Sequence, residues 1–590
     1  MAQMRSECRC GIYSITLFAI LTALILTQIT FAALYESEST PFVEIVGGGK
    51  TRAQIVTPIE PTYLEQFAAT ELQSYLKKIS GVQIAIIKET DCGKLPYSFF
   101  IGATKKAAEV GIEASEEAMG RDGFELRSIA DGIIIRGRVD LGTVFGVYEL
   151  LERYFDVRWF MPGDIGEYVP KSNTLSIGTV QLVFKPSFRF RWVGDGAWAL
   201  CQRMNAYVKA GQKDVGISCK WHCHTFFELL PPEKYYKEYP EYYSMVDGKR
   251  TNKEGTSHNR QLCTTNPDVI KIVAANLIEV LDADPNIETI ALWANDGDGF
   301  CECKNCCAPD EYWRDWFGKY SRRLTIFNNE VAKIVKEKHP KVLIKAGAYA
   351  MYARPPLDKD YQPEDNLFFQ LCHLYFCHNH PLGSNMCKVG ETYEPAEAFK
   401  PNEEFCRILD QWLKLSPHLF IYEYYAVGGM QRAGLPWPLI HTIRSDIPYY
   451  RDHGVEGFYT QFSPESWHRL GLNFYVAAKL CWNADLNVDA LLDDYFDKFY
   501  GPAATPMKEY FMTMEKAMQD WNGCSSYGLP DSAGEKVGPK IFTPEVMKKM
   551  LSCLVEAERL SSGDETIARR VGMVRKMYTE TEESLATINR

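Results

Sequence analysis

The sequence lacks the short motifs that mark several large classes of protein. It contains no G-x-G-x-x-G and no G-x-x-x-x-G-K-[ST], so nothing in it indicates a phosphate site for a nucleotide. The H-E-x-x-H signature of helical zinc hydrolases is also absent. Positive charge is in deficit, with a formal net charge of −11, which argues against a nucleic-acid partner because such a partner needs a basic face.

Long apolar runs are missing after the N-terminal segment. Arg5 and Arg9 precede an apolar run from Ile12 to Leu26, and Thr30-Phe31-Ala32 offers the small residues that a signal peptidase reads. We therefore expect residues 1–32 to be a signal peptide and the protein to be secreted, periplasmic or at the cell surface. An uncleaved anchor is the alternative, since the run to Leu34 is long enough to span a bilayer. We expect no membrane span in the rest of the chain.

The remaining sequence divides into three regions. Residues 41–180 predict a small α/β domain, residues 187–482 alternate strand with helix, and residues 487–590 are helical. The alternation predicts a parallel sheet, and its span fits a (β/α)₈ TIM-like barrel with one strand unassigned. A doubly wound open sheet is the competing fold. The seven expected strands are Phe188–Val193, Val215–Lys220, Ile287–Trp293, Val342–Ala346, Leu367–Leu371, Leu419–Tyr422 and Gly457–Thr460.

The most informative segment runs from Trp293 to Cys307, WANDGDGFCECKNCC. It follows an apolar strand and places Asp296 where a parallel strand gives way to its loop, which is where α/β barrels hold catalytic groups. A turn cap is the plainer interpretation of Asp296. The same segment holds Cys301, Cys303 and Cys306, for which a loop disulfide is the first expectation and a zinc site or buried thiols are the alternatives. We expect no metal and no other cofactor in the active site.

Polar residues follow several other expected strands and would meet at one rim of a barrel. Two carboxylates facing one sugar are the minimum equipment for glycoside hydrolysis, and Glu423 and Asp296 are the pair we select as catalytic. Zinc hydrolysis is the rival chemistry, carried by His222-x-His224 and His378-x-His380. The expected substrate-binding residues are Arg191, His224, Trp293, Asn295, His373, Tyr425, Gln461 and Trp467.

Several motifs resemble known glycosidases. The stretch from Gly137 through Tyr148-Glu149-Leu150-Leu151-Glu152 to Val157-Arg158-Trp159-Phe160 and Pro162-Gly163 resembles the N-terminal domain of α-glucuronidases and β-hexosaminidases. Downstream, Pro240-Glu241-Tyr242-Tyr243, Asn295-Asp296-Gly297 and Cys301-x-Cys303-x-x-Cys306 resemble glycoside hydrolase family 163, which is endo-β-N-acetylglucosaminidase-like.

The resemblance implies an enzyme with a (β/α)₈ barrel and a retaining mechanism assisted by the substrate. In that mechanism the 2-acetamido carbonyl attacks the anomeric carbon, with Glu423 as acid/base and Asp296 orienting the acetamide, or with these roles exchanged. The expected function is thus an exported glycosidase that cleaves a β-N-acetylglucosaminide in a complex glycan. An α-glucuronidase-like hydrolase of plant polysaccharide and a non-catalytic carbohydrate-binding surface protein remain as alternatives. The expected partner is an oligosaccharide or polysaccharide.

Overall fold

The computed structural model describes residues 42–590 except 92, 94, 251–257, 311–314, 388–400, 417, 427–428, 522 and 527–530. The expected signal peptide at residues 1–32 lies outside the described residues, so its cleavage and the export of the protein stay predictions. Within the described part of the chain, no helix combines the length and the apolar character needed to cross a bilayer.

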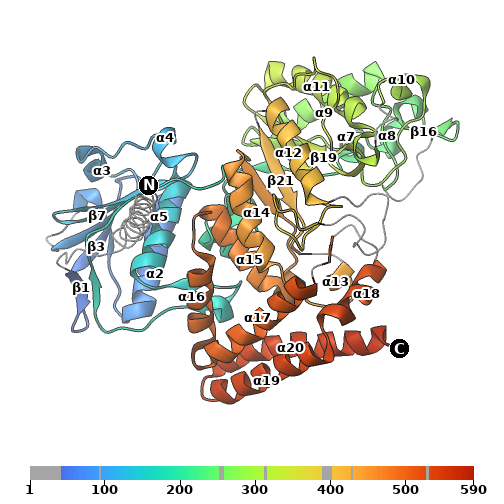
Figure 1. Cartoon of the computed structure of the whole chain (residues 1–590). Helices are drawn as coiled ribbons and strands as arrows, with labels where there is room; N and C mark the ends of the chain where they lie inside the picture. The colour runs from blue at the N-terminus through green and yellow to red at the C-terminus, as the bar shows by residue number, and fades with distance from the viewer. Residues whose placement is uncertain are drawn as a thin grey trace, which may run out of the picture.

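The N-terminal region forms a six-stranded mixed sheet in the order β11-β6-β7-β5-β3-β4 (Figure 1). Helices α2 (Tyr63–Ser80) and α5 (Asp140–Tyr154) pack against each other on the side of this sheet that faces the rest of the molecule. Helix α2 begins at a capping box of Thr62 and Glu65 and ends at Gly81 in the left-handed conformation. The strands are β3 (Ala53–Thr57), β4 (Ile86–Lys88), β5 (Tyr97–Ile101), β6 (Phe124–Ile129), β7 (Gly132–Gly137) and β11 (Gln181–Phe184).

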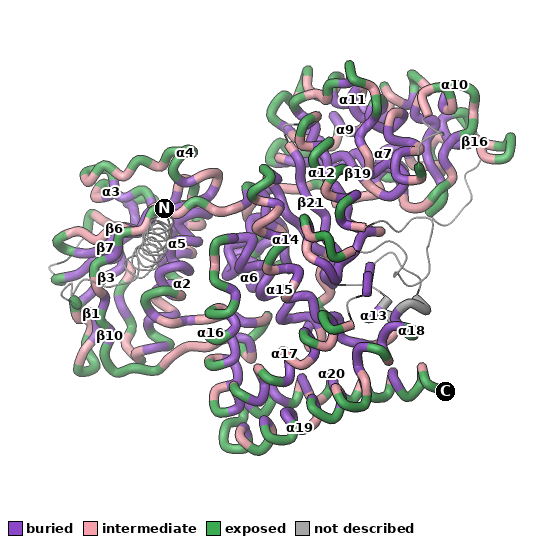
Figure 2. Tube along the Cα trace, in the orientation of Figure 1, coloured by how far each residue is buried: buried purple, intermediate pink, exposed green. Residues whose placement is uncertain are grey.

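A second sheet of seven parallel strands curls through the centre of the molecule in the order β12-β22-β21-β20-β19-β18-β15 (Figure 1). Each strand overlaps one of the seven that the sequence predicts. Figure 2 shows these strands buried beneath helices that are exposed on their outer side. The strands are β12 (Phe190–Trp192), β15 (Cys219–Lys220), β18 (Thr289–Ala291), β19 (Leu343–Ala348), β20 (Leu367–Cys372), β21 (Leu419–Glu423) and β22 (Gly457–Thr460), and the main covering helices are α9 (Pro267–Ala283), α11 (Ser321–Lys338), α12 (Asn402–Leu415), α14 (Ile440–Asp452) and α15 (Trp467–Trp482).

Two residues join the open edges of the curled sheet. The Asn205 amide donates to the Arg191 carbonyl of β12 at 3.2 Å, and the Ile217 amide donates to the Asn205 carbonyl at 2.7 Å. Ala206 and Ile217 also form an isolated parallel bridge just before β15. The ring therefore has an eighth position, which the sequence pattern leaves unassigned because two residues are too few to show a strand period. This closure agrees with the predicted TIM-like architecture.

A buried carboxylate of the N-terminal region holds this closure in place. Asp122, in the loop before β6, accepts a 3.0 Å hydrogen bond from Arg191 Nη2 and a 2.7 Å bond from Asn205 Nδ2. Arg191 is fully buried and also donates to the carbonyls of Phe188 and Arg203. The sequence-based assignment of Arg191 to substrate binding is therefore not supported, because its whole guanidinium group is used between the two sheets.

A second set of buried charges links α5 to the same region. Arg203 contacts Glu149 at 3.0 Å and also pairs with Glu152, which in turn pairs with Lys479 of α15. Burial alone would raise the pKa of Glu152, but Arg203 and Lys479 outweigh it and hold that pKa well below its usual range. Burial lowers the pKa of Lys479 to about 8. Charges of both signs are thus paired where the N-terminal region meets the barrel.

The C-terminal region is a stack of helices beneath the barrel (Figure 1). Helix α19 packs against both α17 and α20, and α20 also contacts α15 of the barrel. The sequence predicts four helices here, and the structure adds the short α18. The helices are α16 (Val488–Tyr500), α17 (Ala504–Trp521), α18 (Asp531–Ile541), α19 (Pro544–Ser561) and α20 (Glu565–Ile588).

Replacing Asp122 by Ala should cost about 3–5 kcal/mol in the free energy of unfolding, because it leaves the Arg191 charge buried without its partner. Urea unfolding followed by tryptophan fluorescence measures this loss. The matched control is Asp131→Ala, which removes an exposed pair with Lys106 at 3.5 Å and should cost less than about 1 kcal/mol. Equal losses in the two variants would contradict the role given to Asp122.

Candidate functional site

The carboxyl-terminal opening of the curled sheet, which we call the mouth, is lined by four rings and one lysine. The four rings meet around His222, whose ring centroid lies 4.7 Å from that of Trp192, 4.6 Å from that of Tyr459 and 5.4 Å from that of Tyr422. Lys345 of β19 joins them, with its Nζ 3.4 Å from His222 Nδ1. A cavity of about 430 Å³ opens beside Trp192 and Tyr459, a size that suits a small ligand. Flat apolar rings of this kind suit the faces of sugars.

Lys345 is a buried cation at the centre of the mouth. Only 6% of its surface is exposed, and no carboxylate among the described residues forms an ion pair with it. Burial lowers its pKa, and the same burial together with the facing lysine lowers the pKa of His222 to about 2. Sequence reasoning missed Lys345, although a single charge inside the apolar run Val342–Ala346 was the available signal. An unpaired buried cation is a functional candidate because it costs stability unless something compensates it.

Asp296 lies at the mouth after the end of β18, as expected, and its side chain is 44% exposed. The Tyr349 hydroxyl donates to its Oδ1 at 3.1 Å, and the Gly297 amide donates to the same oxygen at 2.9 Å. Two imidazoles face the carboxylate: His258 Nδ1 at 3.3 Å and His224 Nε2 at 4.0 Å. An ionised carboxylate accepts such donors, so Asp296 is placed to bind a further N–H or O–H group from a ligand.

His224 is partly exposed and sits on strained backbone. Its Nδ1 lies 2.9 Å from the Ala294 carbonyl, so that nitrogen carries the proton and Nε2 is left facing Asp296. His224 has a φ of 57° and Trp221 a φ of 58°, both in the left-handed region that residues with side chains seldom occupy. Two such residues within four positions indicate a strained loop whose conformation is maintained by its surroundings, as is common at functional sites.

Asn295 holds the Asp296 loop rather than facing the mouth. Its side chain is buried and donates to the Arg260 carbonyl at 3.0 Å, while Gln261 bridges its backbone by accepting from the Asn295 amide and donating to the Asn295 carbonyl. Asn259 adds a bond from its amide to the Asp296 carbonyl at 2.8 Å. The segment 258–261 therefore fixes where Asp296 points.

Glu423 faces away from the mouth. Side chains alternate along a strand, and Tyr422 and Tyr424 stack on each other on the inner side, so Glu423 points outward to α14. It is fully buried, its two oxygens lie 3.1 and 3.2 Å from His373 Nδ1, and it accepts from the Tyr450 hydroxyl. Burial alone would raise its pKa, but His373 and His378 outweigh it and bring the pKa far below the usual range. This geometry does not support the expected acid/base role, which needs a proton near neutral pH and contact with the substrate.

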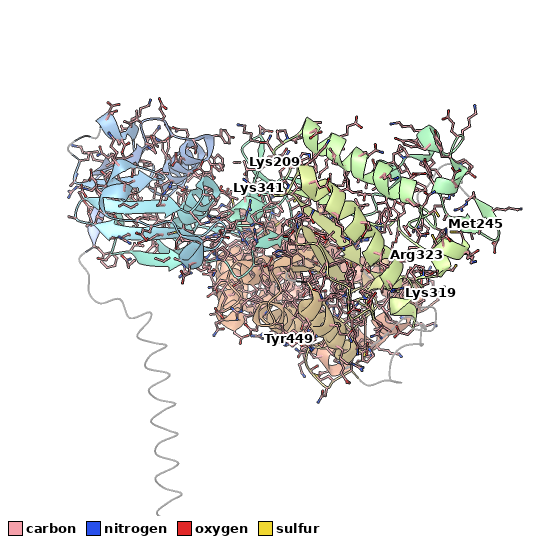
Figure 3. The ribbon with its side chains drawn as sticks, turned by 90° about the horizontal axis from the view of Figure 1, so that it is seen from above. Lys209, Met245, Lys319, Arg323, Lys341 and Tyr449 are labelled. Carbon is pink, nitrogen blue, oxygen red and sulfur yellow. The ribbon has the colours of Figure 1, made fainter. Side chains whose placement is uncertain are left out.

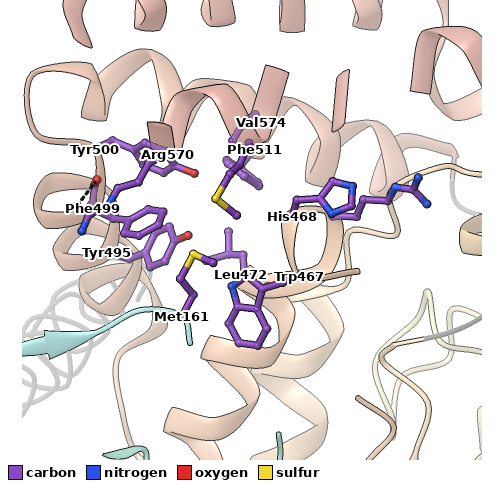
Figure 4. Close-up of a pocket in the computed structure, with 13 residues that line it drawn as sticks. Met161, Trp467, His468, Leu472, Tyr495, Phe499, Tyr500, Phe511, Arg570 and Val574 are labelled. Carbon is purple, nitrogen blue, oxygen red and sulfur yellow. Dashed lines mark hydrogen bonds between the residues drawn. The ribbon is translucent and has the colours of Figure 1, made fainter. Parts of the chain in front are cut away.

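The other predicted residues divide between core and mouth. Gln461 is half-buried at the mouth and donates to the Tyr422 hydroxyl at 3.0 Å. Trp293 and Tyr425 are buried, the former donating to Tyr352 at 3.0 Å. Trp467 lines a small cavity between α15, α16 and α20 instead (Figure 4). That cavity is about 30 Å³, enough for about one water molecule, so Trp467 has no ligand-sized space beside it.

The cysteines of the Asp296 loop lie together, as predicted, but no disulfide joins any of the described cysteines. Cys301, Cys303 and Cys306 are grouped with Cys263, which the sequence reasoning did not consider as their partner. Neither of the two histidine pairs proposed as rival zinc ligands forms a joint metal site. His222 contacts Lys345, while His378 and His380 belong to different clusters of possible ligands.

Replacing His222 by Asn should make the protein less sensitive to acid. The unfolded chain takes up a proton on His222 below pH 6.5, while the folded protein, with a pKa of about 2, does not. The contribution of this residue is therefore full above pH 6.5 and lost as pH falls, by up to about 1.4 kcal/mol per pH unit. Unfolding by urea at pH 7, 6 and 5 measures the slope for both proteins. Identical slopes would show that His222 is not held neutral.

Solved structures resemble this fold at low sequence identity. The family GH115 4-O-methyl-α-glucuronidase BtGH115A, with specificity for decorated arabinogalactans, is 11% identical, with a TM-score of 0.55 over 92% of this chain and 76% of its own. CpGH84B is 12% identical with a TM-score of 0.48, covering 94% of this chain and 90% of its own. The chitobiase of Flavobacterium johnsoniae is 13% identical with a TM-score of 0.43, covering 93% and 90%. The first of these likenesses supports the fold.

Sequence comparison assigns the chain to a family without assigning an activity. No curated protein matches it in sequence. The family described as a domain of unknown function, DUF4838, matches residues 161–513, which include the whole curled sheet and its mouth. This match spans more than half of the chain, and the protein therefore belongs to the DUF4838 family.

Proposed function

We propose that this protein is a glycoside hydrolase whose active site is the mouth of the barrel. The observation that carries the proposal is Asp296: a partly exposed carboxylate at the carboxyl end of a barrel strand, hydrogen-bonded by Tyr349 and flanked by two histidines. The aromatic rings of Trp192, Tyr422 and Tyr459, which contact one another at the same mouth, suit a sugar. The resemblance to family 163 and the likeness in fold to a GH115 enzyme point to the same class of reaction.

The chemistry that suits this site best is substrate-assisted cleavage of a β-N-acetylglucosaminide. Because Glu423 points away from the mouth, the expected pair of facing carboxylates is not formed. A substrate that supplies its own acetamide carbonyl as nucleophile does not need a second carboxylate for that role. We assign Asp296 to accept the acetamide N–H and so orient the attack. We assign His224, whose Nε2 faces Asp296, to proton transfer at the glycosidic oxygen.

Replacing Asp296 by Asn should lower kcat by about 100-fold or more on 4-nitrophenyl N-acetyl-β-D-glucosaminide, because the acetamide loses its orienting partner. The loss should be as large for a 2,4-dinitrophenyl substrate, since a better leaving group does not replace orientation. His224→Gln should instead be partly rescued by that leaving group. Asp298→Asn, an exposed neighbour, is the matched control and should stay within a few-fold of wild type.

Two other results would contradict this assignment. Sugar binding without turnover in the wild type on a panel of glycosides would indicate a carbohydrate-binding protein instead of an enzyme. A Glu423→Gln variant that folds as stably as wild type yet loses all turnover would restore Glu423 as the acid/base. We expect the opposite, a loss of stability, because Gln leaves His373 and Tyr450 facing a neutral group inside the protein.

Lys345 favours a second candidate, the hydrolysis of a uronic acid glycoside. The Lys345 ammonium is buried and has no carboxylate partner in the described part of the chain. The carboxylate of a uronate bound in the mouth would supply that partner. The GH115 enzyme of similar fold is itself named as a glucuronidase. This candidate differs from the first in the sugar that the mouth accepts and also in mechanism, because a uronate has no 2-acetamido group to act as the nucleophile.

The two candidates separate on parallel substrates. If the substrate is a uronate, 4-nitrophenyl α-D-glucuronide or a methylglucuronate-bearing polysaccharide should be cleaved, and Lys345→Met should lower kcat/KM by about 10- to 100-fold because one charge-assisted hydrogen bond is lost. Turnover of the N-acetylglucosaminide alone, with no turnover of any uronate, would reject this second candidate.

A further inference from the structure

Two clusters of sulfur and nitrogen atoms lie outside the mouth and take no part in the proposed reaction. The first cluster comprises Cys263, Cys301, Cys303 and Cys306, and the second comprises Cys377, His380, Cys387 and Cys524. In each cluster the four potential ligand atoms lie within 4.8 Å of one another, and three of the four residues are buried. Sets of four cysteine and histidine side chains gathered in this way are typical of structural zinc sites.

The sulfur–sulfur distances in the first cluster fit a tetrahedral metal site better than a disulfide. The Sγ atom of Cys263 lies 3.8 Å from that of Cys303 and 3.7 Å from that of Cys306. A disulfide needs sulfur atoms about 2.05 Å apart. Four thiolates around one zinc ion, each with a Zn–S bond of about 2.3 Å at the tetrahedral angle, are about 3.8 Å apart. The observed distances match the second arrangement.

The distances in the second cluster also fit a tetrahedral zinc site, with one nitrogen and three sulfur donors. The Nδ1 atom of His380 lies 3.4 Å from Cys377 Sγ, 3.5 Å from Cys387 Sγ and 3.6 Å from Cys524 Sγ. A Zn–N bond of about 2.05 Å and a Zn–S bond of about 2.3 Å at the tetrahedral angle place N and S about 3.5 Å apart. One imidazole nitrogen equidistant from three sulfur atoms is the geometry of a Cys₃His site.

Neighbouring groups stabilise the sulfurs in the way that metal-bound thiolates require. Around Cys301, the Met245 amide donates to Sγ at 3.3 Å and Arg250 Nη1 donates at 3.4 Å. The Thr265 hydroxyl lies 3.0 Å from Cys306 Sγ. Such donors offset the negative charge of a thiolate and orient it toward a metal. Met245 is labelled in Figure 3 at the end of the molecule far from the N-terminal sheet, which places this cluster at the periphery of the barrel.

The loop around the second cluster is braced by Asn402 at the start of α12. Its Oδ1 accepts from the Cys377 amide at 3.0 Å, and its Nδ2 donates to the His380 carbonyl at 2.7 Å. The same Oδ1 lies 3.2 Å from His373 Nε2, so Asn402 links this loop to the His373–Glu423 pair as well. That pair, with His378, is a third group of possible ligands, but Glu423 already binds His373 and Tyr450 directly, and we do not assign a metal to it.

We propose that the protein binds two structural zinc ions, one in the Cys₄ cluster and one in the Cys₃His cluster. Both sites are closed, with four protein ligands each and no position left for a substrate, which is the pattern of structural zinc. The Cys₄ site ties the loop that carries Asp296 to the segment before α9. The Cys₃His site ties the loop after β20 to Cys524, which follows α17 of the C-terminal helices. Cysteines and a histidine select zinc over magnesium or calcium, which prefer oxygen.

The test is a metal analysis of the full chain, made without a polyhistidine tag and purified without chelators. Mass spectrometry of the metals should find about two zinc ions per chain, the number of closed sites. Cys263→Ser and Cys524→Ser should each lower the content by about one ion, because a three-ligand remnant binds zinc far more weakly. Cys553→Ser is the matched control, since this buried cysteine of α19 lies in neither cluster, and it should leave the zinc content unchanged.

The wild type alone decides the outcome if the variants fail to fold. A mercurial reagent that blocks thiolates should release the zinc, counted with a chromogenic chelator, and should also lower the melting temperature. A folded wild type with no bound metal, or an intact mass that shows disulfides within either cluster, would overturn the proposal. Iron at the same stoichiometry would overturn the choice of zinc. None of these readouts depends on glycosidase activity, so the proposed function can fail while the metal sites stand.

Discussion

The ion pair between Asp122 and Arg191 is the constraint on which the rest of the molecule depends. Asp122 belongs to the N-terminal region, in the loop before β6, yet both groups that it binds, Arg191 and Asn205, belong to the closure of the barrel. Asn205 in turn supplies the backbone bonds to Arg191 and Ile217 that complete the ring. The N-terminal region is therefore part of the structural support of the barrel, because a carboxylate from outside the barrel binds the two residues that close it.

The division of labour within the barrel follows from the alternation of side chains along its strands. On β21, Tyr422 faces the mouth and Glu423 faces α14; on β12, Trp192 faces the mouth and Arg191 faces the N-terminal sheet. The inner residues that line the mouth are mainly aromatic, with Lys345 as a cation among them, whereas the outer charged residues Arg191 and Glu423 are paired and buried. The catalytic chemistry we propose thus falls to loop residues such as Asp296, and the charged residues of the strands mainly hold layers together.

The seven strands, α2 and the position of Asp296 could be predicted from sequence because each depends on local patterns: apolar runs, a capping box and a turn after a strand. The eighth barrel position could not, because Asn205 and Ala206 show no period. The direction of Glu423 was missed because strand ends are uncertain by a residue, and one residue exchanges the two faces. Cys263 was missed as a partner of this cluster because Cys263 and Cys303, which lie together in the fold, are 40 positions apart in the sequence. Contacts between residues that are far apart in the chain cannot be recognised from a single sequence.

The two cysteine clusters also differ in when they can form. Cys263 and Cys306 are 43 residues apart, whereas His380 and Cys524 are 144 residues apart. During synthesis the first cluster can assemble while the barrel is still incomplete, but the second must wait until Cys524, which follows α17, has been made. Closing the longer loop costs more chain entropy, though only by about 1 kcal/mol for this ratio of lengths. The second cluster can therefore form only after the strands of the barrel and helices α16 and α17 have been made.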